Sequence, residues 1–168
     1  LVSGVARPDA GRVQLDGADL AGLTPEAVAA RGLGRSFQNP RLFPKLTVWE
    51  NLMVAGADPR SEGLATSLVG IAARRDLQAE IAARAEATLA TLELSRLRDE
   101  PAAHLSGGQR KLLSLGRLMM RGPKLMLLDE PAAGVNRTLA NRIFEHIGQL
   151  NAQGTSFLIV EHEIDLVM

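Results

Sequence analysis

The sequence predicts an α/β fold with a mostly parallel sheet. Two short apolar runs, residues 125–128 and 156–160, have the length and composition of strands that are buried on both faces. Helical patterns precede them at residues 111–120 and 139–150, and this alternation of helix and strand is typical of a parallel sheet. Gly154 stands between the second helix and the second strand, where a helix-ending glycine belongs.

Shorter elements are predicted in the first part of the chain. Residues 11–17 alternate apolar and polar side chains between glycines, which is the pattern of a half-buried strand followed by a turn. Thr24 before Pro25 predicts the start of a helix that ends near Arg31, because threonine caps a first turn and proline fits its first position. Residues 33–37 predict a second strand.

A loop and two more helices are predicted next. Two prolines deny residues 38–44 a regular structure. A threonine and a glutamate at positions 47 and 50 have the spacing of a capping box and open a helix over about 48–55. Residues 58–75 have only a weak pattern and predict an inserted surface segment. Residues 76–94 predict a long helix with apolar side chains at every fourth position, namely Leu77, Ile81, Ala85 and Leu89.

The composition is that of a globular protein. The 168 residues carry no net charge, are 46% hydrophobic and 23% charged, and include no cysteine. A disulfide scaffold and a thiolate metal site are therefore excluded, and the balanced charge gives no reason to expect nucleic acid as a partner. The longest uncharged stretches fall short of the roughly 20 apolar residues that cross a bilayer, and no signal-peptide pattern follows Leu1.

Residues 105–109, LSGGQ, precede a predicted helix and admit two interpretations. In the first, Ser106 caps the helix and Gln109 returns the hydrogen bond, as in a capping box. In the second, Gly107 and Gly108 let an anion approach the backbone, and the N–H groups at the helix start favour a phosphate. These residues taken alone favour capping, which is the commoner use of the pattern.

Two acids and a histidine follow the apolar runs. Asp129 and Glu130 end the first run, and His162 follows the second. Open α/β sheets bind ligands at the carboxyl ends of their strands, so one acid would hold Mg²⁺ while the other polarises an attacking water. The plainer alternative for the two acids is a solvated strand end with a helix-capping acid, and a lone histidine is more often structural than catalytic. His104 and His146 lack such a setting and are predicted to be structural or surface residues.

Together these clusters resemble the ATP-binding cassette (ABC) family over essentially the whole chain. Residues 105–109 match the family signature, and the strand ending in Asp129 and Glu130 follows at the usual spacing. Gln38 matches the Q-loop and His162 the switch histidine. Residues 133–136 match the D-loop, with Asn136 where many members carry aspartate. Residues 34–43, 57–75 and 161–168 look more narrowly like the ATP-binding subunits of branched-chain amino acid importers.

The resemblance implies a P-loop NTPase-like fold, in which a helical subdomain is inserted into the mostly parallel sheet and a small antiparallel β element is added. The chain would be an incomplete nucleotide-binding domain over residues 1–168. Residues 1–56 and 122–168 would form parts of the α/β core, and residues 57–121 would form the insertion and the helical signature subdomain.

The resemblance also implies ATP and Mg²⁺ as cofactors and a head-to-tail dimer with ATP between two cassettes. In that dimer Asp129 and Gln38 would serve the metal, Glu130 would act on the attacking water, and His162 would contact the γ-phosphate. Gln38 would also sense the water. The remaining nucleotide-binding residues would be Ser106, Gly107, Gly108, Gln109 and Asn136.

The implied partners are a second cassette, identical or related, and transmembrane permease subunits. The loop after Gln38 would face the permease through Leu42, Phe43 and Leu46, whereas Phe37 is expected to pack in the core. A periplasmic solute-binding protein would take part indirectly, and nucleic acid would not. The resemblance thus implies a peripheral protein on the cytoplasmic face of the inner membrane.

No phosphate-binding loop of the form Gly-x-x-x-x-Gly-Lys-Ser/Thr occurs in the sequence. We therefore expect a fragment of an importer ATPase, with little ATP affinity and negligible hydrolysis by itself. Two alternatives stay open. One is a truncated, non-hydrolytic cassette that acts as a binding or regulatory half, and the other is an ABC ATPase for a different solute or a soluble one in DNA repair or translation. The coding sequence upstream of Leu1 separates the first two.

Overall fold

The computed structural model describes residues 2–6, 9–36, 41–57 and 71–162. A parallel sheet of three strands lies at its centre, in the order β3 (Leu33–Arg35), β4 (Leu125–Asp129) and β5 (Ser156–Val160). The register pairs Leu125 with Ser156 and Asp129 with Val160, so β4 and β5 finish side by side. The predicted α/β class and parallel pairing are confirmed.

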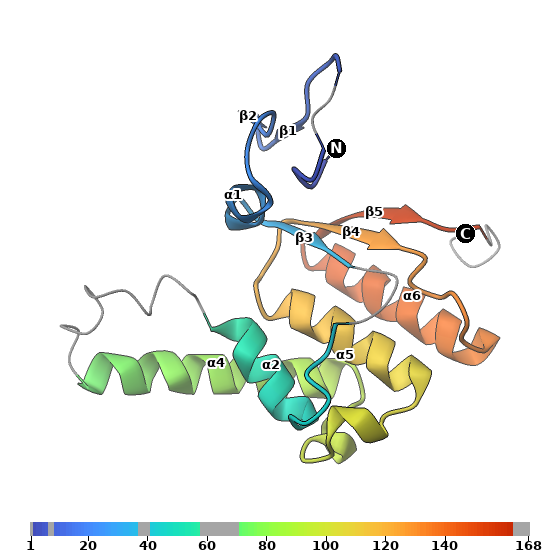
Figure 1. The fold of residues 1–168 in the computed structure, drawn as a ribbon. Coiled ribbons are helices and arrows are strands. Elements are labelled where there is room, and N and C mark those ends of the chain that lie inside the picture. The colour runs from blue at the N-terminus through green and yellow to red at the C-terminus, as the bar shows by residue number, and fades with distance from the viewer. Residues whose placement is uncertain (1, 7–8, 37–40, 58–70, 163–168) are drawn as a thin grey trace.

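Two helices lie under one face of this sheet, α5 (Gly107–Met119) and α6 (Arg137–Ala152), and Figure 1 shows them side by side. Both helices are amphipathic. Their apolar sides pack against Met126 and Leu128, the buried β4 side chains on this face of the sheet. A single hydrophobic core therefore joins the sheet to the two helices.

A helical layer packs against the far side of α5. It contains α2 (Val48–Gly56), α4 (Ile71–Thr91) and the short 3-10 helices η2 (Ser95–Leu97) and η3 (Ala102–His104). Because α2 contacts both α4 and α5, it packs with the helical layer, although the expected division put residues 1–56 in the α/β core. That division stays a prediction.

The helix α4 differs from its predicted extent. It begins at Ile71, so the end of the expected surface segment is helical, and residues 58–70 lie outside the described part of the chain. Ile81, Ala85 and Leu89 are buried as predicted, whereas Leu77 is 40% exposed. Figure 1 shows the reason, because the first half of α4 runs past the end of α2.

The N-terminal part covers some of the opposite face of the sheet. A two-residue turn with positive φ at Asp16 (50°) and Gly17 (76°) joins β1 (Gln14–Leu15) to β2 (Ala18–Asp19). The helix α1 (Pro25–Ala30) begins as predicted at its cap, Thr24. A small core of Leu20, Val28 and Leu33 then packs with Leu125 and Leu127 of β4.

The prediction that both apolar runs are buried on both faces is wrong for β5. Leu158 and Val160 are 51% and 54% exposed. They share a sheet face with Leu127 and Asp129, to which they are paired in register. The N-terminal core covers that face over β3 and β4, but no described element reaches across to β5, which is an edge strand.

Candidate functional site

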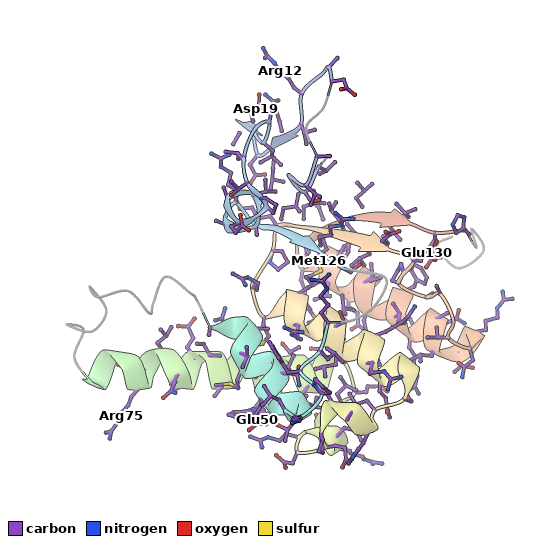
Figure 2. All side chains as sticks on the ribbon, viewed as in Figure 1. Arg12, Asp19, Glu50, Arg75, Met126 and Glu130 are labelled. Atoms are coloured by element: carbon purple, nitrogen blue, oxygen red, sulfur yellow. The ribbon has the colours of Figure 1, made fainter. Side chains whose placement is uncertain are left out.

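The carboxyl ends of β4 and β5 bring Glu130 and His162 together. The imidazole Nε2 of His162 lies 3.0 Å from the carboxylate Oε1 of Glu130, and the two side chains are 83% and 25% exposed, respectively. Asp129 is the last residue of β4, one position earlier. Figure 2 shows Glu130 just past the end of that strand. Three residues that the sequence singled out therefore gather at one edge of the sheet.

Glu130 is held in an unusual backbone conformation. Its φ of 47° lies in the left-handed region, which non-glycine residues seldom adopt. Its N–H donates to the carbonyl of Val160 at 2.9 Å, which fixes the turn against the end of β5. Strained backbone of this kind is concentrated at functional sites, and here it aims a carboxylate at a neighbouring histidine.

Two further groups hold the loop that follows β4. The carboxylate of Glu161 accepts a hydrogen bond from the N–H of Ala132 at 3.0 Å. The ammonium of Lys111, on α5, donates to the carbonyls of Glu130 at 3.3 Å and Pro131 at 3.2 Å, and also to that of Ala133. The loop is thus attached to both β5 and α5.

Gln38 lies outside the described residues, as does Phe37. The chain just before them is nevertheless tied to the site. The N–H of Ser36 donates to the carbonyl of Leu127 at 2.9 Å, and the hydroxyl of Ser36 accepts from the N–H of Asp129 at 3.1 Å. This pair extends the contact between β3 and β4 beyond the last residue of β3.

The start of α5 has the geometry of a complete capping box. The hydroxyl of Ser106 accepts from the N–H of Gln109 at 3.3 Å, and the side chain of Gln109 accepts from the N–H of Ser106 at 2.8 Å. The capping interpretation is confirmed, and the anion-binding one remains compatible with it. A Cβ on Gly107 would meet nothing within 4 Å, so the backbone is open to an approaching group there.

The D-loop position caps the neighbouring helix. The side-chain oxygen of Asn136 accepts from the N–H of Leu139 at 2.9 Å, so Asn136 is the N-cap of α6. A cavity of about 400 Å³ lies between this helix start and the strand ends, and Glu130 and His162 line it together with Gly134, Arg137 and Glu161. Ser106 and Gln109 do not line it, so one chain presents two separate groups of candidate residues.

The metal expected at Asp129 would have few protein ligands. Within the described part of the chain, no group of three or more His, Cys, Asp or Glu side chains is placed to hold a metal ion. Asp129 and Glu130 nevertheless supply hard carboxylate oxygens at adjacent positions. Such a donor set suits Mg²⁺, which usually binds one or two carboxylates while keeping waters and substrate phosphate oxygens as its other ligands.

The expected permease-facing loop is organised from beneath by Asn51. This asparagine is fully buried, accepts from the N–H of Phe43 at 2.9 Å, and donates to the carbonyls of Phe43, Leu46 and Thr47 at 3.0, 3.2 and 2.9 Å. Phe43 remains 45% exposed above it. The guanidinium of Arg117 lies 5.1 Å from the Phe43 ring centroid, and burial lowers the pKa of Arg117.

The comparison with known families agrees with this arrangement. The family profile described as "ABC transporter" matches residues 1–133. The chain belongs to the ABC transporter family. Within that family it is 40% identical to a probable branched-chain amino acid transport ATP-binding protein, LivG, of Archaeoglobus fulgidus, over 99% of this chain and 64% of that protein. The protein of the same description from Methanocaldococcus jannaschii is 36% identical over 100% of this chain and 65% of its own length.

Solved ABC cassettes have the same fold. A nucleotide-free ATP-binding cassette from an ABC transporter is 37% identical and superposes with a TM-score of 0.79, covering 99% of this chain and 65% of that one. A cassette in its ADP conformation gives 36% identity and the same TM-score. The chain thus spans a little under two thirds of the length of these ABC relatives. None of its described helices is long and apolar enough to cross a membrane.

Sequence reasoning missed several residues of this ABC cassette. Lys111 and Ser36 bond to backbone groups that are distant in sequence, and Asn51 bonds to an irregular loop four to eight positions before it, so no short periodic pattern marks these contacts. Glu161 had one available signal, its position directly before the switch histidine. His104 is exposed and paired with Glu100 at 2.6 Å, and His146 is buried in α6, in agreement with their predicted structural roles.

Proposed function

We propose that this chain is part of the ATP-hydrolysing subunit of an importer for branched-chain or related amino acids. The observation that carries the proposal is the Glu130–His162 pair beside Asp129, at the ligand-binding edge of a parallel sheet. The names of the relatives support the solute class, because each is described as a branched-chain amino acid transport protein.

In this proposal Glu130 is the general base. Its side chain is one-quarter exposed and lines the adjoining cavity, so it could accept a proton from a water bound there. Without nucleotide, the imidazole Nε2 of His162 would orient that carboxylate. With nucleotide bound, His162 would donate a hydrogen bond to the γ-phosphate. Asp129, with Gln38, would hold Mg²⁺, whose charge would offset that of the phosphates.

Ser106, Gly107, Gly108 and Gln109 would bind the nucleotide of a second cassette in a head-to-tail dimer. The capping box leaves the backbone of Gly107 open at the start of α5, where the helix dipole favours a phosphate. Asn136 would contact the same partner from the start of α6. The exposed ring of Phe43 would face the permease, on the cytoplasmic side of the inner membrane.

The test uses the full-length gene product with Glu130→Gln. Without the base we expect turnover to fall by about a hundredfold or more, and an ATP-bound dimer to accumulate in gel filtration. Glu145→Gln is the matched control, because Glu145 is an exposed acid on the surface of α6. Unchanged turnover in Glu130→Gln refutes Glu130 as the base. The solute class is tested separately by uptake of labelled leucine, isoleucine and valine in a strain lacking the gene.

A further inference from the structure

The ammonium of Lys111 lies among three backbone carbonyls. Lys111 is in the first turns of α5, and its Nζ donates to the oxygens of Glu130 at 3.3 Å, Pro131 at 3.2 Å, and Ala133. An ammonium has three N–H donors, and here each has an acceptor. All three acceptors belong to the loop that begins at the catalytic carboxylate. The contact therefore joins two segments that are 19 or more positions apart in sequence.

This cation is partly withdrawn from water. Burial lowers the pKa of Lys111, and the nearby carboxylates of Glu161 and Glu130 offset only part of that effect. A lysine on a helix surface normally extends its charge into solvent, because desolvating an ammonium is costly. The three carbonyls are what compensates for the lost hydration at this position.

The loop needs support at the point where Lys111 binds. Glu130 has a φ of 47°, in the left-handed region that non-glycine residues adopt only against a steric penalty. Its N–H is held by Val160 and its carboxylate by His162. Its carbonyl accepts from the N–H of Ala133 at 3.1 Å and from the ammonium of Lys111 at 3.3 Å, so the lysine adds a contact from α5 to a turn that the backbone also holds.

We propose that Lys111 is a positioning residue for Glu130, which fixes the direction of that carboxylate by holding the carbonyls of the loop. This inference rests on the proposed role of Glu130 as the base. Lys111 does not touch the nucleotide in this scheme and acts only through the loop. Because Ser106 begins the same helix, α5 links the residues that bind one nucleotide of the dimer to the base that acts on the other.

The test compares three variants of the full-length gene product. Lys111→Met removes the donors while keeping the length of the side chain, and Lys111→Arg keeps a cation with several donors. Lys124→Met is the matched control, because Lys124 pairs with Asp16 at the surface. For each variant we would measure kcat, the KM for ATP, and hydrogen–deuterium exchange of the amides of residues 132–135 without nucleotide.

We expect Lys111→Met to lower kcat by about ten- to a hundredfold, since a misplaced catalytic group costs a factor of that order. The KM for ATP should change by less than about twofold, because the binding contacts are untouched. Exchange of the loop amides should rise severalfold. Lys111→Arg should recover most of the kcat and most of the protection of the loop amides. Lys124→Met should match the wild type in kcat, KM and exchange.

Two outcomes would overturn the proposal. If amide exchange of the loop is unchanged in Lys111→Met, then Lys111 does not hold the loop. If exchange rises while kcat is unchanged, then the contact is structural only. If the wild-type protein hydrolyses no ATP, the proposed function fails, and the exchange data still decide whether Lys111 holds the loop. Should Lys111→Met not fold, Lys111→Gln, which reaches fewer carbonyls, provides the same comparison.

Discussion

Leu139 of α6 packs directly on the backbone of Gly108 in α5. A Cβ built on Gly108 would lie 1.8 Å from Cδ2 of Leu139, which is far inside any permitted contact. The glycine that is proposed to bind nucleotide is therefore also a packing position, where a larger side chain would force Leu139 to move. Both helices begin at this crossing, with Ser106 capping one and Asn136 the other.

This packing predicts different results for the two signature glycines. Gly108→Ala should destabilise the protein by about 1–3 kcal/mol, the usual cost of overpacking a core contact. Gly107→Ala should have little effect on stability, because a Cβ there meets nothing within 4 Å. Leu139→Ala should recover part of the loss when it is combined with Gly108→Ala. Urea unfolding of Gly107→Ala, Gly108→Ala, Leu139→Ala and the Gly108→Ala/Leu139→Ala double variant measures this coupling. Equal losses of stability for the two glycine variants would contradict it.

Ser106→Asp separates capping from phosphate binding. Aspartate is as good an N-cap as serine, so the free energy of unfolding should stay within about 0.5 kcal/mol of the wild type. Its negative charge would repel a phosphate at the open start of α5, and ATP-dependent dimerisation should be lost. Ser106→Ala, by contrast, should cost about 1 kcal/mol of stability by removing the cap. ATP-dependent dimerisation that survives in Ser106→Asp would argue against a phosphate at this helix.

Asn51 should be among the most sensitive positions of the helical layer. Asn51→Ala removes the acceptor of the Phe43 N–H and one of the two donors to each of the carbonyls of Phe43, Leu46 and Thr47, which keep their backbone donors. We expect a loss of about 1–3 kcal/mol, because the N–H of Phe43 loses its hydrogen-bond partner and the removed buried side chain leaves a small cavity. Asn141→Ala, on the exposed face of α6, is a suitable control. Thermal unfolding and hydrogen–deuterium exchange of the amides of residues 43–47 would show whether the loop loses its shape.

Glu26 should make the stability depend on pH in the acid range. Hydrogen bonds from its own backbone N–H and from the Thr24 side chain hold the pKa of this carboxyl below its ordinary value of 4.5. A lowered folded-state pKa stabilises the protein above the unfolded-state pKa, and this contribution disappears as the pH falls through the folded-state value. Wild type should therefore exceed Glu26→Gln in stability at neutral pH, and the difference should vanish in acid. A difference that is independent of pH would exclude the carboxylate as its source.

Local rules account for the elements that were predicted well. Thr24, Thr47 and Ser106 each cap a helix as expected, because a cap depends on residues only three positions apart. The parallel pairing of β4 and β5 followed from the alternation of strand and helix. The extent of α4 was less predictable, because its first residues lack the apolar spacing that burial against α2 imposes later.

The sequence by itself determined the α/β class, the capped starts of α1, α2 and α5, and the placement of Asp129, Glu130 and His162 at strand ends, since each depends on neighbouring residues or on a short periodic pattern. Only the tertiary structure decided that Lys111 and Asn51 hold loops, that Gly108 is a packing site, and that Leu158 and Val160 of β5 stay exposed. These features depend on which elements come to lie against one another. That outcome is set by the packing of side chains far apart in the chain, and no local pattern encodes it.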